Sequence, residues 1–473
     1  MKTLKFLTLL LSFAFVFISC SDDDDNSITM EPKNAVEIAL ETPQLTSLVA
    51  ALERADGDLI NVLSGAGPFT ILAPDNAAFA SFLSENGFNS LNDVPTDVLS
   101  QILLNHVIMA DIKSSDLISL GSGYASGSAT GAEDNNISIY FDTSNDVRFN
   151  NAGSVIVPDI DASNGTIHII NGVLGLPDVV DHALANPSFS SLVAALGAAD
   201  GDLVNVLKGD GPFTVLAPDN AAFETFLDGT PLGDVNTAAL SQILLNHVIV
   251  GSTITSEFLV NAEAGYSNTA ATGAGGNAMS LYFDTSDGVK FNGISSVLQA
   301  DVVGTNGVIH AVNTVIDIPT VVTFATADPT FTTLVSALTE LTPATDFVSI
   351  LSRTSGNNSD GINPDFTVFA PTNDAFAALI EDLGGVPDEA TLTSVLLYHV
   401  VGEANITSGD LMAGSNPVTS LQGGMFTINV PGTGNNIANI TDGSGASDIG
   451  VIAVDVQAGN GVIHVINKVM LPN

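Results

Sequence analysis

The stretch Phe69-Thr-Ile-Leu-Ala-Pro-Asp-Asn-Ala-Ala-Phe79 decides the fold, because the chain contains it three times. It returns with small changes as Phe213-Thr-Val-Leu-Ala-Pro-Asp-Asn-Ala-Ala-Phe223 and as Phe366-Thr-Val-Phe-Ala-Pro-Thr-Asn-Asp-Ala-Phe376. Its first half is short, apolar and partly β-branched, which predicts a buried strand. The proline ends that strand, and the residue after it is a good N-cap for a following helix: Asp75, Asp219 or Thr372.

Two further blocks follow each copy in the same order. The first predicts a helix that ends where a strand begins, and it reads Leu-Leu-Asn-His106-Val, Leu-Leu-Asn-His247-Val and Leu-Leu-Tyr-His399-Val. The second reads Asn164-Gly-Thr-Ile-His168, Asn306-Gly-Val-Ile-His310 and Asn460-Gly-Val-Ile-His464. An Asn-Gly pair between apolar runs predicts a tight hairpin, whose positive φ is supplied by Gly165, Gly307 and Gly461.

The repeats predict three tandem globular domains. The copies lie 144 and 153 residues apart, a period that is too long for a solenoid repeat. We place the domains at residues 33–177, 178–319 and 320–473, since each copy closes on a proline. Almost no linker separates them, which predicts a stiff string of domains. Apolar residues at helical spacing predict that an amphipathic helix opens each copy, for example Leu45, Leu48, Val49 and Leu52.

The N-terminus has the pattern of an export signal. Residues 1–19 carry Lys2 and Lys5 around the start of an apolar run that suits a signal-peptide h-region and is too short for a comfortable transmembrane helix. Cys20, the only cysteine, stands where a bacterial lipoprotein is cleaved. The segment resembles a lipobox, although Phe17 stands where leucine is commoner. We therefore expect residues 1–19 to be removed and Cys20 to be acylated. An ordinary secretory signal with a chance cysteine is the alternative.

Residues 20–32 are predicted to be the lipidated cysteine followed by an acidic spacer. The run Asp22–Asp25 resembles surface-export signals of lipoproteins in some Gram-negative bacteria, and its plain alternative is a solvated spacer. We expect a chain that is anchored by lipid in the outer membrane and exposed at the cell surface.

The charge of the chain excludes several classes of partner. Its 473 residues hold 10 Lys and Arg against 52 Asp and Glu, a formal net charge of −42. Nucleic acids and anionic lipid surfaces need clustered basic residues, so we expect no nucleic-acid partner and no membrane contact except through the lipid anchor. One cysteine excludes intramolecular disulfides and cysteine-based zinc sites.

Repulsion among the acids predicts diffuse cation uptake. A specific calcium site is the alternative, although Asp159-Ile-Asp161-Ala-Ser-Asn164-Gly165 lacks EF-hand spacing.

Six of the seven histidines form one pair in each domain: His106 and His168, His247 and His310, His399 and His464. We interpret them as core residues that hydrogen-bond the backbone. Two imidazoles could also begin a metal site, but zinc needs three or four protein ligands and no HExxH helix is present. The chain has neither a Gly-Xaa-Ser-Xaa-Gly elbow nor a Gly-Lys-Ser loop. We therefore expect no enzyme activity, no catalytic residue, no metal and no cofactor.

The three blocks, in this order and spacing, resemble the fasciclin-like domain, also called FAS1 or beta-Ig-H3, over residues 33 to 473. The resemblance implies an α+β fold in which each domain is a β-sandwich wedge of short strands with packed helices. It also implies extracellular adhesion or matrix interaction without catalysis. The central motif of the family is often Tyr-His, which is linked to adhesion in animal members. Only Tyr398 and His399 match it here, because Asn105 and Asn246 replace the tyrosine in the first two domains.

These observations together predict a cell-surface lipoprotein that binds partners through exposed faces of its domains. The expected role is adhesion, and the expected partner is an extracellular polymer, a glycan or a cell-surface protein. A carbohydrate or small-ligand capture lipoprotein at the outer membrane is the alternative. A hydrolase is a third reading, for which the sequence offers no set of catalytic residues. Because a fold does not specify a function, the adhesion role rests on the family resemblance.

Overall fold

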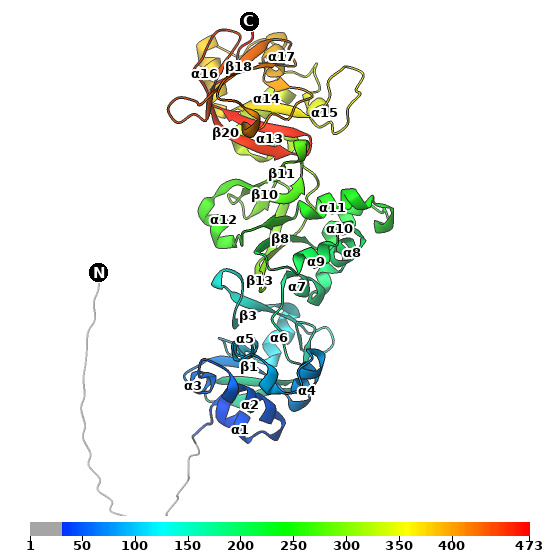
Figure 1. Cartoon of the computed structure of the whole chain (residues 1–473), viewed down its shortest axis with the longest axis vertical. Helices are drawn as coiled ribbons and strands as arrows, with labels where there is room; N and C mark the ends of the chain where they lie inside the picture. Colours follow the sequence, from blue (N-terminus) through cyan, green and yellow to red (C-terminus); the bar gives the residue numbers. More distant parts are fainter. Residues whose placement is uncertain (1–30) are drawn as a thin grey trace, which may run out of the picture.

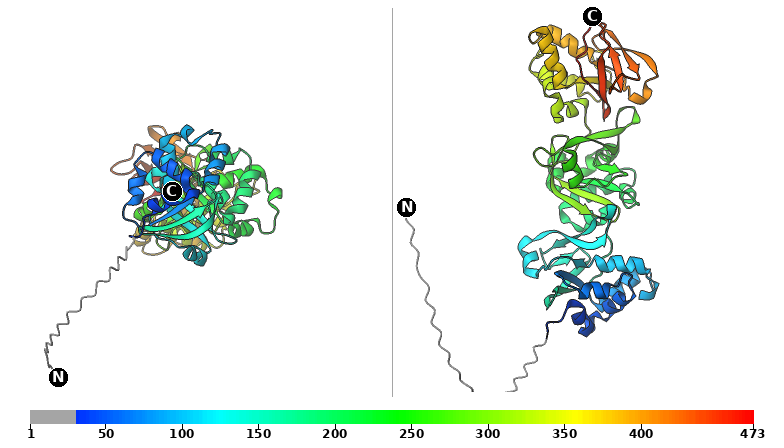
Figure 2. Two further views of the ribbon diagram at one scale, coloured as in Figure 1. Left: turned by 90° about the horizontal axis from the view of Figure 1, so that it is seen from below. Right: turned by 90° about the vertical axis from the view of Figure 1, so that its left-hand side faces the viewer.

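The computed structural model describes residues 31–473, which fold into three domains arranged in a row (Figure 1). The side view in Figure 2 shows the same single file, and the view from below shows the domains one behind another. Each domain contains helices and a seven-stranded sheet. The predicted α+β class and the threefold repetition are therefore confirmed. Cys20 and the predicted export signal lie outside the described residues.

The first domain runs from α1 to β7. Its helices are α1 (Ala35–Glu41), α2 (Thr46–Arg54), α3 (Leu59–Ser64), α4 (Asn76–Glu85), α5 (Thr96–Leu104) and α6 (Ser114–Leu120). Its strands are β1 (Phe69–Pro74), β2 (Val107–Ile108), β3 (Ser122–Thr130), β4 (Asn136–Asp142), β5 (Arg148–Phe149), β6 (Gly153–Ala162) and β7 (Gly165–Ile170), and they close into a barrel.

The second domain repeats this order from α7 to β14. Its helices are α7 (Val179–Ala185), α8 (Ser190–Ala198), α9 (Leu203–Leu207), α10 (Asn220–Leu227), α11 (Thr237–Leu245) and α12 (Ser256–Ala262). Its strands are β8 (Phe213–Pro218), β9 (Val248–Val250), β10 (Ala264–Thr272), β11 (Ala278–Asp284), β12 (Lys290–Phe291), β13 (Ser295–Val303) and β14 (Gly307–Val312).

The third domain runs from α13 to β21 and replaces the sixth helix by the 3-10 turn η8 (Ser408–Asp410). Its helices are α13 (Val321–Ala327), α14 (Thr332–Thr339), α15 (Phe347–Leu351), α16 (Asn373–Leu383) and α17 (Glu389–Tyr398). Its strands are β15 (Phe366–Pro371), β16 (Val400–Val401), β17 (Gly414–Thr419), β18 (Met425–Val430), β19 (Ala438–Thr441), β20 (Ile449–Ala458) and β21 (Gly461–Ile466).

Within residues 31–473 no single helix has both the length and the apolar composition to cross a membrane. One sharply bent pair, α13 with the segment Pro329–Thr339, passes that test by length and composition alone.

The repeated stretch forms the centre of each domain, as predicted. β1 is buried along its whole length, and it pairs in parallel with β7 and antiparallel with β2. β8 and β15 have the same two neighbours in their own domains. The predicted N-caps are also confirmed, since the Asp75 carboxylate accepts a hydrogen bond from the backbone N–H of Ala78 at 2.7 Å. Asp219 and Thr372 cap α10 and α16 in the same way.

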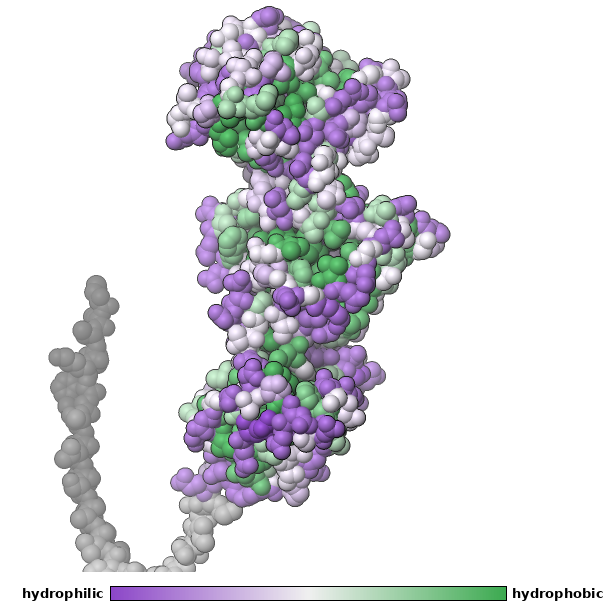
Figure 3. All heavy atoms as spheres, in the orientation of Figure 1, coloured by the Kyte–Doolittle hydropathy of each residue, from purple (hydrophilic) through white to green (hydrophobic). Residues whose placement is uncertain are grey.

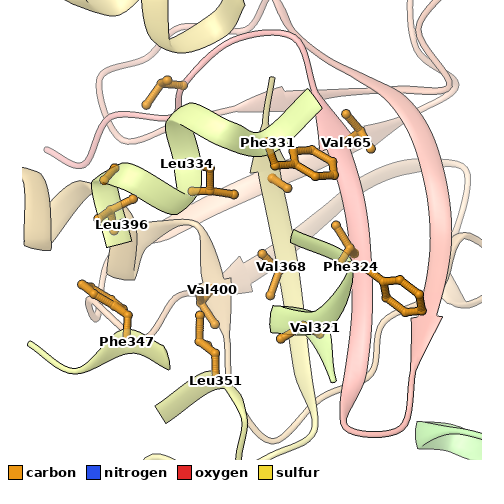
Figure 4. Packing of buried hydrophobic residues seen from close by; sticks show 14 of the residues in the cluster. Val321, Phe324, Phe331, Leu334, Phe347, Leu351, Val368, Leu396, Val400 and Val465 are labelled. Atoms are coloured by element: carbon orange, nitrogen blue, oxygen red, sulfur yellow. The ribbon is translucent and has the colours of Figure 1, made fainter. Parts of the chain in front are cut away.

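Two hydrophobic layers lie on opposite sides of this central strand. Ile71 and Ala73 belong to the layer beneath the helices, whereas Leu72 between them belongs to a second layer enclosed by the sheet. Successive side chains of a strand point to opposite faces of the sheet. A strand that contacts an apolar layer on each face must therefore be apolar at every position. Figure 4 shows the first layer of the third domain, where Phe331 lies beside Val465 of β21.

The predicted closing hairpin is confirmed, but the predicted role of its glycine is wrong at one position. Ala162 of β6 pairs with Gly165, so Ser163 and Asn164 form the turn and the glycine opens β7. Gly307, at the same place in β14, does not have a positive φ. Gly165 and Gly461 have the predicted positive φ, at 147° and 159°. The second domain therefore makes this turn without placing its glycine at positive φ.

Close contact with the neighbouring strand explains the glycine instead. A Cβ atom on Gly165 would lie 1.9 Å from the carbonyl oxygen of Phe69, the first residue of β1. The corresponding distance to the adjacent strand is 2.3 Å at Gly307 and 2.1 Å at Gly461. No side chain fits between two backbones this close, so all three positions require glycine.

A short helix that the sequence analysis did not predict opens each domain: α1, α7 and α13. Each has seven residues, too few to show a helical period clearly. Asn34 and Glu37 form a capping box at the start of α1. The hairpin asparagine also holds this helix, because the Asn164 side-chain oxygen accepts a hydrogen bond from the backbone N–H of Ala35 at 2.9 Å. The first helix and the last hairpin of the domain are thereby joined.

Candidate binding surfaces and motif histidines

The first histidine of each pair lies between a helix and the next strand, inside the domain. The Nδ1 atom of His106 donates to the carbonyl oxygen of Ile102 at 2.7 Å, and its Nε2 atom accepts from the backbone N–H of Leu174 at 2.8 Å. A backbone N–H can only donate, so Nε2 is the acceptor and Nδ1 carries the proton. His247 and His399 make the same two bonds in their own domains.

The second histidine of each pair carries its proton on the other nitrogen. The Nε2 atom of His168 donates to the carbonyl oxygen of Ile112 at 2.9 Å, and its Nδ1 atom accepts from the backbone N–H of Asp159 at 3.2 Å. His310 and His464 repeat this arrangement, with longer Nδ1 contacts of 3.4 Å. Each pair therefore uses all four ring nitrogens to bind backbone groups.

This bonding leaves the six rings little capacity for metal or proton chemistry. Burial lowers the pKa of His106, His247 and His399 to about 4, so these rings are neutral near pH 7. A metal ion would have to displace the backbone groups that already occupy the nitrogens. Within the part of the chain that the structure describes, no group of three or more His, Cys, Asp or Glu is arranged to hold a metal ion.

The Tyr-His motif of the third domain also lies inside the fold. The hydroxyl of Tyr398 donates to the carbonyl oxygen of Met425 at 2.7 Å, and its ring packs against Phe426 with centroids 5.7 Å apart. Tyr398 is 0 % exposed and His399 is 3 % exposed. Both side chains of the motif are therefore buried in the interior of the third domain.

Three aspartates have a structural role that was not predicted from the sequence. The Asp159 carboxylate accepts hydrogen bonds from both the backbone N–H and the hydroxyl of Ser114, at the start of α6. Asp301 and Asp455 make the equivalent contacts in the other two domains, with Ser256 and Ser408. Asp159, which belongs to the calcium-like segment of the sequence, therefore caps the start of α6. The signal was present in the sequence, since each aspartate precedes the second motif histidine by nine residues.

The junctions between domains are packed and repeat one another. At the first junction, the backbone N–H of Val303 on β13 donates to the hydroxyl oxygen of Ser138 on β4 at 3.0 Å. At the second, the backbone N–H of Gln457 on β20 donates to the hydroxyl oxygen of Ser280 on β11, also at 3.0 Å. The closing hairpin of each following domain thus lies against the sheet of the domain before it.

A tyrosine fills the centre of each junction. The ring of Tyr124 lies edge-on to His182, the seventh histidine, with centroids 5.9 Å apart, and its hydroxyl accepts from the Asn186 amide at 3.1 Å. At the second junction Tyr266 lies edge-on to Phe324 at 5.8 Å. Its hydroxyl donates to the Asp328 carboxylate at 2.9 Å. Both junctions therefore have a packed core of their own, which holds the domains in a fixed row.

The two tyrosines give a matched test of the junctions. Tyr266→Phe is expected to lower the free energy of unfolding by about 2 kcal/mol, because the nearly buried Asp328 carboxylate loses the tyrosine hydroxyl and keeps only the backbone N–H of Thr330 as a donor. Tyr124→Phe removes only a bond from a neutral amide and should cost about 1 kcal/mol. Urea unfolding of the full chain measures both. Equal losses would show that the hydroxyl of Tyr266 does not stabilise its junction through Asp328.

Comparison with known proteins identifies the family to which the three domains belong. The family model described as "Fasciclin domain" matches three times, at residues 43–177, 187–319 and 329–472. Transforming growth factor-beta-induced protein ig-h3 of Sus scrofa is 27 % identical over 455 residues, which cover 94 % of this chain and 58 % of that protein. Periostin of Homo sapiens is 26 % identical over 425 residues, covering 88 % of this chain and 45 % of that protein. The chain thus spans about half the length of these curated relatives.

A cyanobacterial relative and a solved structure show similarity over smaller parts of the chain. Protein sll1483 of Synechocystis is 41 % identical over 157 residues, covering 32 % of this chain and 73 % of that protein. A FAS1 domain pair from the insect cell adhesion molecule fasciclin I covers 58 % of this chain and 97 % of its own, with 18 % identity and a TM-score of 0.36, a likeness too low to carry an argument. The family assignment rests on the three domain matches, which cover most of the residues. The chain belongs to the fasciclin domain family.

Proposed function

We propose that this chain is a non-enzymatic adhesion protein, anchored by lipid in the outer membrane and exposed at the cell surface. The observation that supports adhesion best is the fixed row of three related domains. Packed junctions hold three versions of one domain surface in set positions (Figure 1). Such an array favours a repetitive partner, since the second and third contacts form at high effective concentration. An extracellular polymer, a glycan or a cell-surface protein offers such repeats.

The histidine geometry supports a binding role over catalysis. The nitrogens of the six motif histidines are engaged with backbone groups, and burial keeps the first ring of each pair neutral at pH 7. A general base must reach the proton that it abstracts, and these rings face the interior of their domains. The proposed partners therefore bind to exposed faces of the rod. We propose no nucleic-acid partner and no membrane contact except through the lipid anchor.

Adhesion is tested with beads that carry the full chain without its export signal. Beads are washed under increasing flow over surfaces coated with cells or with extracellular polymer from the producing organism. We expect retention that rises steeply with the density of the protein, because several weak contacts act together. Beads carrying serum albumin are the control. Equal retention of both kinds of bead at every density would contradict an adhesion role.

The anchor gives a second expected result. Cys20→Ser should move the protein from the membrane fraction to the soluble fraction, because the acyl chains on this cysteine are the proposed attachment. Fractionation followed by immunoblotting measures the change, and labelling with a fatty-acid analogue measures the modification itself. Ser27→Ala, in the same segment, is the control and should leave both unchanged. A wild-type protein that carries no lipid label would overturn the proposed anchor.

Capture of a saccharide or other small ligand is the second candidate function. It is favoured by one observation, a cleft of about 300 Å³ between the first and second domains. The two functions are compatible, because an array that adheres to a polymer can bind sugar units through such a cleft.

A further inference from the structure

The cleft lies at the first junction, the lower of the two constrictions in Figure 3. The first domain contributes two loops to it, residues 150–152 and 175–177, and the second domain contributes one side of α7. Its volume of about 300 Å³ is at the small end of the range for ligand pockets, which suits a single sugar ring and its substituents. Because two domains line it, the cleft exists only while the junction is packed.

Polar groups from both domains face this cleft. Asn151 is exposed at its rim, and Asn150 beside it accepts a hydrogen bond from the backbone N–H of Tyr140 at 2.7 Å through its side-chain oxygen. That bond leaves the Asn150 amide N–H groups as donors. Across the cleft, Asp181 of α7 is held by Lys208 at 3.0 Å, which fixes a carboxylate as an acceptor.

The equivalent asparagine at the second junction supports this interpretation. Asn292 accepts from the backbone N–H of Tyr282 at 2.9 Å, as Asn150 does from Tyr140. Its Nδ2 atom is buried and has no hydrogen-bond partner within the described residues. A buried amide N–H without an acceptor is costly. The side-chain amide N–H groups of Asn150 and Asn292 are therefore donors that a ligand could satisfy. At the first junction a cleft gives a ligand access to the Asn150 amide.

Apolar side chains complete the cleft. Leu184 of α7 is 54 % exposed, and Leu176 and Pro177 line the side that belongs to the first domain. Amides and a carboxylate beside small apolar groups match the hydroxyl groups and the C–H faces of a sugar. An acidic lining residue and a net charge of −42 disfavour uronic acids and sulfated sugars. We propose that this cleft binds a neutral sugar unit, an inference that rests on the proposed binding role and locates it.

The second junction differs at the two positions that matter. Gly293 takes the place of Asn151, and a Cβ atom on it would lie 3.3 Å from the Cβ atom of Ala327. The turn therefore lies directly against α13. Thr326 takes the place of Leu184. The second junction therefore lacks the side-chain amide of Asn151 and the apolar side chain of Leu184. We expect one sugar site for each chain.

The test uses the full chain without its export signal and a panel of neutral methyl glycosides of hexoses and N-acetylhexosamines. Isothermal titration and saturation-transfer NMR should find a member of the panel that binds one per chain with a Kd of about 1 mM, as expected for so small a ligand. Asn151→Ala should weaken that binding by about 5-fold or more. Leu184→Ala should weaken it as well. The corresponding glucuronide should bind more weakly than the neutral glycoside.

Leu40→Ala is the matched control. Leu40 occupies the same position on α1 as Leu184 on α7 and is 57 % exposed, but no described domain packs before α1 to form a cleft. Binding that this variant reduces as much as Leu184→Ala does would overturn the site. Failure of every neutral glycoside to bind would overturn it too, as would binding that neither cleft variant weakens.

The source of the sugar is decided by a second comparison. An oligosaccharide that ends in the bound sugar should bind at least as tightly as the methyl glycoside if the natural ligand is a polymer end. Weaker binding identifies a free saccharide, and both results uphold the site. Bead adhesion that survives Asn151→Ala, combined with loss of glycoside binding, shows that adhesion uses other faces as well. Wild-type beads that adhere no better than albumin beads, while the glycoside still binds, contradict the adhesion proposal and leave the sugar site standing.

Discussion

Gly461→Ala is expected to lower the free energy of unfolding of the third domain by about 3 kcal/mol or more. The added Cβ atom would lie 2.1 Å from the carbonyl oxygen of Phe366, with the rest of that peptide on the same side. β21 and β15 pair along their whole length, so neither can move away without breaking the central ladder. Calorimetry of the full chain should show the transition of the third domain at a clearly lower temperature.

Gly385→Ala is the control for this substitution. Gly385 has a φ of 157°, nearly the same as the 159° of Gly461, and a Cβ atom on it would have no neighbour within 4 Å. The two variants therefore change backbone freedom in the same way and differ in the space around the added atom. The control should cost about 1 kcal/mol. Equal losses in both variants would show that backbone conformation, rather than contact with β15, makes glycine necessary.

The free energy of unfolding is also expected to fall steeply between pH 7 and pH 5. Burial lowers the pKa of four imidazoles from 6.5 to about 4: His106, His182, His247 and His399. Below pH 6.5 these histidines become protonated in the unfolded chain. In the native protein they stay neutral until the pH nears 4. Protons therefore favour unfolding throughout this interval. At pH 5 each ring should account for a loss of about 2 kcal/mol.

Urea unfolding followed by circular dichroism at the two pH values measures this loss, and His182→Phe provides the comparison. Phe324 fills the corresponding place on α13, so the junction accepts a phenyl ring at this position. The variant should keep its stability at pH 5 better than the wild type does, because one of the four rings no longer titrates. A wild-type protein with the same free energy of unfolding at both pH values would contradict the burial of neutral imidazoles.

The sequence predicted best those features that depend on a few neighbouring residues. The strand from Phe69, the N-cap Asp75 of the helix after it and the helix-to-strand junction at His106 all follow from local apolar pattern and cap chemistry. Threefold repetition strengthened each of these predictions, since a chance pattern does not recur at the same place.

Features formed by distant parts of the chain were harder to predict. Nothing near Tyr124 in the sequence shows that its ring will face His182 of the next domain. The need for glycine at position 165 comes from the backbone of Phe69, about a hundred residues away, and not from the turn beside it. The buried position of Tyr398 likewise depends on β18, whose Met425 carbonyl receives its hydroxyl. In each case the deciding contact is tertiary.

The difference between the junctions and the sheets determines how the array responds to mechanical tension. Inside each domain a parallel ladder of six residue pairs joins the repeated strand to the last strand, for example β1 to β7. The first junction has fewer polar contacts: a backbone bond from Ala132 to Gly304, the Ser138 hydroxyl and the Tyr124 hydroxyl. Under tension along the row of domains, the junctions should therefore part before any domain unfolds. The rod would lengthen in two small steps, absorb the load, and re-form when the force is released.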